Sequence, residues 1–124
     1  MGRIVFLNKM VVDGLINLLS EITSADQCTY GKAGSKVVAL ANAVIGFLEE
    51  ASKNTARVYS RTSSVEFIPV MGEVAERIAR EIMLLSRYLS TECGSIYGGK
   101  LLFLYNELVR MSSKDLLYEV VGGV

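Results

Sequence analysis

The chain has no histidine and no tryptophan among its 124 residues, and it has only one proline and two cysteines. Without histidine the sequence lacks both the commonest general base and the commonest metal ligand. Cys28 and Cys93 lie far apart and do not have the paired spacing of zinc ligands. The carboxylates form no recognisable acid–base pair. We therefore predict no metal, no cofactor and no enzymatic activity.

Net charge and long apolar runs are also missing. Because 13 Lys and Arg balance 13 Asp and Glu, we expect no long-range attraction of the whole molecule to nucleic acid or to an anionic membrane. The longest uncharged apolar run, Val37 to Leu48, has 12 residues, whereas a membrane-spanning helix needs about 20. Lys9 and Asp13 interrupt the start of the chain where a secretory signal needs apolar residues. We expect a cytoplasmic protein.

The sequence does contain long, periodic apolar segments. Hydrophobic residues make up 51% of the chain and charged residues 21%, and 124 residues suit one domain, 1–124. We predict an all-α fold in which four main helices form an antiparallel bundle and a short C-terminal helix follows. Apolar residues at three- and four-residue steps place these helices at 3–22, 34–61, 70–91, 100–111 and 116–121.

Segments rich in glycine, serine and threonine connect the expected helices. Ser35 is the predicted N-cap of the central helix, because its hydroxyl can accept from a free backbone N–H of the first turn. In the second connection, Val65, Phe67 and Ile68 precede the single proline, and we expect a short extended piece there. The connections are residues 23–35, 60–69 and 92–99.

The second half of the central helix has the clearest concentration of positive charge. Residues 28–64 contain five Lys or Arg and two Asp or Glu, a net charge of +3. Lys53, Arg57 and Arg61 follow one another at four-residue spacing, which stacks them along one stripe of a helix. Glu49 lies four residues and Glu50 three residues before Lys53, so part of this charge is expected to form helix-stabilising pairs. The remaining positive charge fits either a solvated face or a contact with a phosphate backbone.

Two of the connections resemble each other. CTYGKAGSK and CGSIYGGK each contain a cysteine, then a Tyr-Gly pair, then a lysine at a helix start, and an antiparallel bundle places both at one end. In a structural interpretation the glycines form turns and the tyrosines pack over the bundle end. In a functional one, backbone N–H groups and lysines bind an anion while tyrosines stack on bases. The residues concerned are Tyr30, Tyr97, Lys32, Lys36 and Lys100.

The same end would hold both cysteines. A disulfide between Cys28 and Cys93 and a pair of free thiols are both open alternatives. Disulfides are rare inside cells outside hyperthermophiles. A bridge that closes so long a loop would stabilise the fold by about 4–5 kcal/mol in the chain-entropy model.

The third expected helix carries charged residues at four-residue spacing on its outer face, which predicts a solvated surface with helix-supporting ion pairs. The predicted pairs are Glu73–Arg77, Glu76–Arg80 and Arg77–Glu81.

The mean hydropathy of +0.37 is high for a small helical bundle. Several apolar residues flank the primary faces of the expected helices, and one bundle core cannot easily cover all of them. We therefore predict an exposed apolar patch, and with it a protein partner or self-association. The flanking residues are Val5, Phe6, Met83, Leu84, Leu102 and Phe103.

The stretch TYGKAGSKVVALANAVIGFLEEASKNTARVYSR resembles the start of the small helical subunits of archaeal type I-A CRISPR effector complexes, which act in antiviral defence. Both have a tyrosine-bearing loop and then an amphipathic helix with a Leu-Ala-Asn-Ala core, here Leu40 to Ala43. The resemblance implies a non-catalytic subunit that packs beside other subunits and helps to hold guide RNA and target DNA. Lys53, Arg57 and Arg61 are the candidate contacts by their chemistry.

These observations lead to two main functional hypotheses. In the first, the protein is a non-enzymatic small subunit of a nucleic-acid-handling assembly of the CRISPR interference type. Its partners would be other protein subunits and RNA or single-stranded DNA, with no membrane. In the alternative, it is a self-assembling structural or scaffold bundle, such as an archaeal virus coat protein. A small enzyme with its site at the Tyr-Gly-Lys end ranks third.

Overall fold

The computed structural model describes residues 4–53, 56–59 and 64–112, and these are mainly helical. The mainly helical character predicted from the sequence is confirmed. In chain order the elements are β1 (Ile4–Asn8), α1 (Lys9–Ser24), α2 (Asp26–Thr29), α3 (Gly31–Ala51), β2 (Ala56–Tyr59), β3 (Ser64–Met71), α4 (Gly72–Tyr88), α5 (Thr91–Cys93), a π-helical turn (Gly94–Gly98) and α6 (Gly99–Ser112).

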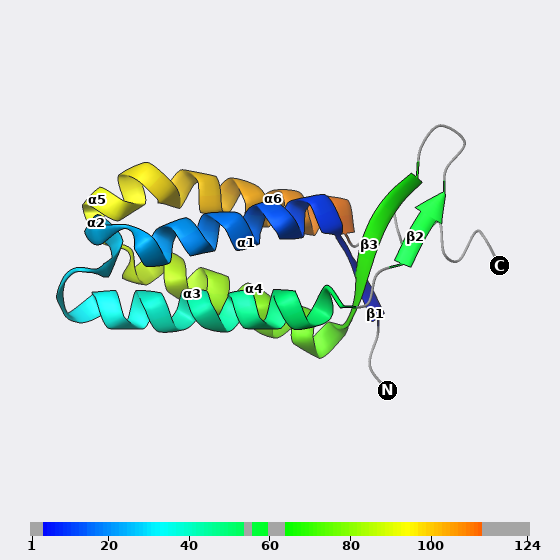
Figure 1. Ribbon diagram of the computed structural model, residues 1–124, viewed down its shortest axis with the longest axis horizontal. Coiled ribbons are helices and arrows are strands. Elements are labelled where there is room, and N and C mark those ends of the chain that lie inside the picture. The colour runs from blue at the N-terminus through cyan, green and yellow to red at the C-terminus, as the bar shows by residue number, and fades with distance from the viewer. Residues whose placement is uncertain (1–3, 54–55, 60–63, 113–124) are drawn as a thin grey trace.

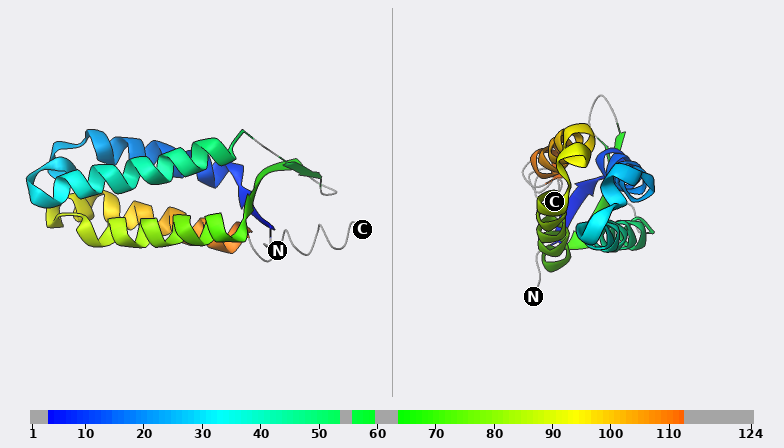
Figure 2. Two further views of the ribbon diagram at one scale, coloured as in Figure 1. Left: turned by 90° about the horizontal axis from the view of Figure 1, so that it is seen from below. Right: turned by 90° about the vertical axis from the view of Figure 1, so that its left-hand side faces the viewer.

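The long helices and the strands occupy different parts of the molecule. Helices α1, α3, α4 and α6 lie side by side along the long axis, and the strands gather at one end of them (Figures 1 and 2). The short helices α2 and α5 lie at the opposite end (Figure 1). The sheet is an addition to the predicted all-α fold.

The three strands form one antiparallel sheet in the order β1-β3-β2. In the register of the central strand, Phe67 of β3 lies opposite Asn8 of β1 on one side and Ala56 of β2 on the other. The extended piece predicted around residues 65–68 is therefore confirmed as β3, but the two strands that pair with it were not predicted.

The helix expected over residues 3–22 is wrong for its first turns, which form β1. Val5 and Leu7 are buried at a spacing of two residues, as a strand with one covered face requires. Asn8 then ends the strand and caps α1, because its side-chain oxygen accepts a hydrogen bond from the backbone N–H of Val11 at 3.2 Å. Ile4, Leu7 and Val11 fit a helical period as well, so periodicity alone could not separate the two structures.

The central helix also differs from the prediction at both ends. It begins at Gly31 instead of at Ser35, with Tyr30 in the N-cap position and no side-chain cap. The Ser35 hydroxyl instead donates to the Lys32 carbonyl oxygen at 3.4 Å. The helix ends at Ala51 instead of continuing to residue 61. Its buried apolar row stops there, and residues with lower helix propensity follow.

The later elements agree with the sequence more closely. Helix α4 spans 72–88 where 70–91 was predicted, and α6 spans 99–112 where 100–111 was predicted. The connection predicted at 92–99 is wrong, because α5 and the π-helical turn lead directly into α6. The predicted last helix, 116–121, lies outside the described residues.

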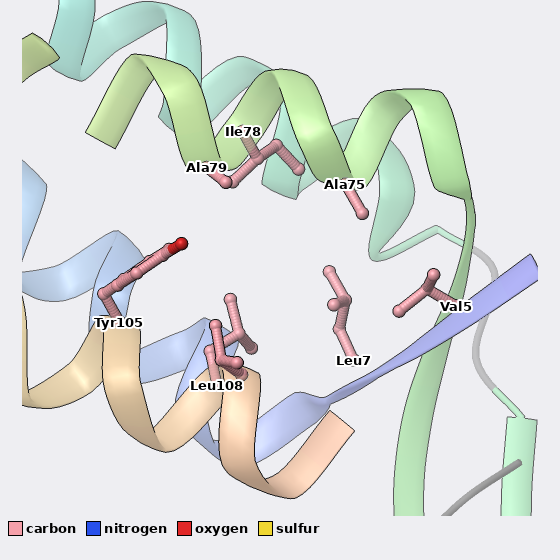
Figure 3. A pocket seen from close by; sticks show the side chains of 8 residues that line it. Val5, Leu7, Ala75, Ile78, Ala79, Tyr105 and Leu108 are labelled. Carbon is pink, nitrogen blue, oxygen red and sulfur yellow. The ribbon is translucent and has the colours of Figure 1, made fainter. Parts of the chain in front are cut away.

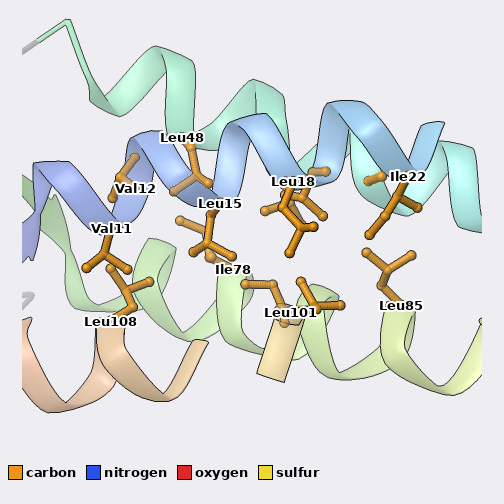
Figure 4. Packing of buried hydrophobic residues seen from close by; sticks show 14 of the residues in the cluster. Val11, Val12, Leu15, Leu18, Ile22, Leu48, Ile78, Leu85, Leu101 and Leu108 are labelled. Atoms are coloured by element: carbon orange, nitrogen blue, oxygen red, sulfur yellow. The ribbon is translucent and has the colours of Figure 1, made fainter. Parts of the chain in front are cut away.

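The core runs the length of the helices, and α1 lies at its centre. Leu15, Leu19 and Ile22 of α1 are fully buried. Figure 4 shows α1 side chains directed toward those of α4 and α6 across the core. Of the lateral helix pairs, α4 and α6 contact each other least, so this is the side on which the helical layer is least closed.

Candidate protein-interaction site

The helix end away from the sheet is cross-linked. A disulfide joins Cys28 of α2 to Cys93 of α5, with their Cα atoms 4.9 Å apart, and both residues are buried. Ser90 reinforces this link, because its hydroxyl donates to the Gln27 carbonyl oxygen at 2.8 Å and accepts from the Cys93 N–H at 3.1 Å. The two Tyr-Gly-Lys segments are thus held at one end of the molecule.

The aromatic and basic residues of that end differ in their surroundings. Tyr30 is 75% exposed, whereas Tyr97 is half-buried and packs against the core. The Lys36 ammonium lies 5.1 Å from the centre of the Tyr88 ring, so its charge already has an aromatic partner. Within the described part of the chain, no hydrogen bond, ion pair or ring contact joins Tyr30, Tyr97, Lys32 and Lys100 to one another.

The basic stripe expected on the central helix is wrong as a helical feature. Lys53 follows the end of α3, Arg57 belongs to strand β2, and Arg61 lies outside the described residues. Four-residue spacing places side chains on one stripe only in a helix, and here the chain has left the helix. The predicted pair with Glu50 is confirmed. Lys53 Nζ lies 2.9 Å from the Glu50 carboxylate, and this hydrogen bond raises the pKa of Lys53.

The ion pairs predicted along α4 are also wrong. Glu73–Arg77, Glu76–Arg80 and Arg77–Glu81 do not form ion pairs in the structure. The Arg77 guanidinium instead lies 5.1 Å from the centre of the Phe47 ring on α3. This cation–π contact links α4 to α3 and replaces the expected contacts within α4.

The predicted exposure of apolar side chains is confirmed for the residues that lie on α4 and α6. Met83, Leu84 and Leu102 are each 42% exposed, and Phe103 is 63% exposed. The prediction was wrong for Val5, which is buried in the core as part of β1. The neighbouring Phe6 is half-buried. We use "outer face" below for the exposed side of α4 and α6 that carries Met83, Leu102 and Val109, the last of which is 50% exposed.

Helix α6 has few polar groups to keep its exposed side in water. Glu107 and Arg110 bind each other through two hydrogen bonds of 2.8 and 3.2 Å, and these bonds lower the pKa of the Glu107 carboxyl. Leu102, Phe103 and Val109 remain exposed around the same helix. Exposed apolar residues that lie beside polar ones mark a candidate contact with another protein.

A cavity and a groove lie where α4 and α6 fail to close on each other. Ala75 and Ala79 of α4 are small, and Tyr105 of α6 points across the gap toward α4 (Figure 3). The cavity has a volume of about 80 Å³ and is lined by residues of β1, α4 and α6. The adjoining open groove is lined by Ala79, Arg80, Met83, Leu84, Arg87 and Tyr105.

The chemistry of this region is that of a contact surface. Its lining is apolar except for the Tyr105 hydroxyl and the two arginines, Arg80 and Arg87, so it holds no nucleophile paired with a base. Neither arginine has a carboxylate partner within the described residues. The groove therefore combines apolar area with positive charge available for an acidic group.

Two features are absent from the residues that the structure describes. No group of three or more acidic or cysteine side chains is placed to hold a metal ion among them. None of their helices combines the length and the apolar character needed to cross a bilayer.

Sequence reasoning missed part of this site. Arg80 was predicted in an ion pair with Glu76, and Tyr105 was not predicted to line a groove. Arg87 and Val109 were not considered. The spacing of Leu102, Tyr105 and Val109, at steps of three and four residues, was the signal that places them on one side of a helix. Comparison of the chain with known protein families, with curated proteins and with solved structures finds no match.

Proposed function

We propose that this protein is a non-enzymatic subunit of a larger assembly and that it binds another protein through the outer face of α4 and α6. The observation that carries the proposal is the exposure of Met83 in an open groove that Tyr105 of α6 also lines, with Leu102 and Val109 exposed about one helical turn to either side of Tyr105. Contiguous exposed apolar area bordered by charge is typical of protein–protein contact sites.

Protein fits this face better than the other ligand classes. Nucleic acid is bound mainly by clustered cations and stacked aromatic rings, but the outer face has only two arginines, Arg80 and Arg87, and one tyrosine among mainly apolar side chains of the described residues. A small-molecule pocket usually encloses most of its ligand in about 300–1,000 Å³. The cavity here measures only about 80 Å³, and the adjoining groove of about 510 Å³ is open to solvent. A helix or other apolar surface of a protein can cover Leu102 and Val109 together.

The rest of the molecule suits the role of a rigid support. We infer that the four long helices act as one antiparallel bundle. The short connections, the Cys28–Cys93 disulfide at one end and the sheet at the other support this inference. A rigid support lowers the entropic cost of presenting a binding surface. We propose a cytoplasmic location on the sequence composition alone.

The CRISPR version of this proposal specifies the partners as other subunits of an RNA-guided complex. Its support is the resemblance of residues 29–61 to the small subunits of those complexes. The dispersal of Lys53 and Arg57 over a helix end and a strand weakens the case for a basic stripe. In this version the protein contributes mainly protein–protein contacts, with Lys32 and Lys100 as the remaining exposed cations of the cross-linked end.

Site-specific photo-cross-linking tests the proposed function. A photoreactive phenylalanine analogue is placed at Leu102 in cells that naturally make the protein, and the cross-linked products are mapped by mass spectrometry. Asn42, which is exposed on α3, is the matched control position. We expect protein cross-links at position 102 and few at position 42.

The mapped partner separates the versions of the proposal. Different subunits together with short bound RNA would support the RNA-guided version, and copies of the same chain would support the self-assembling one. Equal and low cross-linking at positions 102 and 42 would contradict the proposed function.

A further inference from the structure

One row of α4 on the outer face has an acidic residue at one end and a basic residue at the other, and no ion pair within the described chain involves either of them. Glu76, Arg80, Met83 and Arg87 are all exposed and follow one another at steps of four, three and four residues. This is the spacing of a seven-residue repeat, so the four side chains form one line along the helix. Glu76 and Arg87 stand at its two ends, about 16 Å apart at 1.5 Å per residue.

This row is complementary to itself when reversed. If two α4 helices lie antiparallel with their centres between residues 81 and 82, Glu76 of each faces Arg87 of the other. Arg80 of each then faces Met83 of the other, where its methylene groups can cover the thioether. Two identical ion pairs and two apolar contacts result, as expected for an interface between identical surfaces.

We propose that the occupant of the outer face is a second copy of this chain, related by a two-fold axis that passes between the two α4 helices at the level of residues 81 and 82. The inference rests on the proposed function and names the partner. Neither Glu76 nor Arg87 has an ion-pair partner within its own chain among the described residues. Both charges are therefore available to the second copy.

The same two-fold axis accounts for the exposed residues of α6. Helix α6 lies beside α4, and a two-fold axis perpendicular to α4 in the interface plane also brings the two copies of α6 opposite each other (Figure 2). Leu102 and Val109 would then be covered by apolar groups of the second copy. The groove that carries Met83 and Tyr105 would be closed in the same step.

Charge reversal at the two ends of the row tests the proposal. Glu76→Arg places an arginine opposite Arg87 of the second copy, and Arg87→Glu places a glutamate opposite Glu76. Each single variant has two repulsive contacts per dimer. We expect each to raise the dimer dissociation constant about tenfold or more. The double variant Glu76→Arg/Arg87→Glu restores attraction at both contacts and should dimerise like the unmodified chain.

Mixing gives the most specific result. When the Glu76→Arg and Arg87→Glu variants are combined in equal amounts, both contacts of the mixed dimer join opposite charges. We therefore expect a heterodimer from two variants that each dimerise at least tenfold more weakly alone. Sedimentation velocity measures each state, and Glu49→Arg, at an exposed position on α3, controls for the change in net charge. Circular dichroism and thermal unfolding verify that every variant is folded.

The outcomes separate this inference from the proposed function. A dimer that the single reversals weaken, and that the double reversal or mixing restores, supports it. A monomeric unmodified chain at micromolar concentration would overturn it, as would a dimer insensitive to both single reversals. If the chain is monomeric but position 102 cross-links to a different protein, the homodimer fails and the proposed function stands.

Discussion

Removing the Cys28–Cys93 disulfide is expected to lower the free energy of unfolding by about 4 kcal/mol. The bridge closes a loop whose ends are 65 residues apart, and it restricts the unfolded chain more than the folded one. For a chain of this size, such a loss lowers the melting temperature by roughly 10–20 °C. Both cysteines are buried, so the bridge also ties α2 to α5 inside the core.

Urea unfolding of Cys28→Ala, Cys93→Ala and the double variant measures this effect. Each single substitution already removes the bridge, so the three variants should be destabilised by similar amounts and should not show additive losses. Ser20→Ala, at an exposed position on α1, is a suitable control with little expected effect. An unchanged unfolding free energy in the double variant would show that the disulfide contributes no stability.

Gly34→Ala is expected to destabilise the protein by roughly 2–3 kcal/mol. Gly34 is buried in the first turns of α3, and a methyl group added there would overlap the carbonyl group of Thr29 at the end of α2. Backbone atoms cannot move aside as the end of a flexible side chain can, so the α2–α3 junction would have to shift. Close approach of the two backbones explains why glycine occupies this position.

Gly46→Ala supplies the matched control in the same helix. No atom lies within 4 Å of a methyl group added at Gly46, and alanine has the higher helix propensity. We expect this variant to gain about 1 kcal/mol. Equilibrium unfolding of both variants therefore tests the sign as well as the size of the change in unfolding free energy. A Gly34→Ala variant as stable as the unmodified protein would mean that α2 and α3 do not approach each other this closely.

The long helices could be predicted from sequence because most of their apolar residues recur at three- and four-residue steps. The apolar rows of α4 and α6 are regular, and their predicted bounds lie within three residues of those observed. The apolar residues of 4–8 fit both the period of a strand and that of a helix. The strand changes to a helix at Asn8, whose side chain accepts a hydrogen bond from the Val11 N–H. Strands β1 and β2 depend on pairing with β3, a long-range contact that local patterns do not contain.

The candidate site was predictable in composition but not in arrangement. Met83, Leu84, Leu102 and Phe103 exceeded what one core could bury, and the structure exposes all four. The contacts of the charged residues on α4 were harder to predict. A four-residue spacing predicts an ion pair within the helix only when no better partner lies on another element. Arg77 lies against Phe47 of another helix, a contact that no local pattern encodes.

The oxidation rates of two methionines test most directly whether protein covers the outer face. Met83 lies on that face and is 42% exposed, whereas Met10 lies on α1 and is 83% exposed. Hydroxyl-radical footprinting with mass spectrometry compares both residues within one sample, first in the assembly and then after dilution. We predict that Met83 is protected in the assembly and becomes reactive on dilution, while Met10 stays reactive throughout. Oxidation of Met83 at about half the rate of Met10 in both samples would contradict a covered outer face.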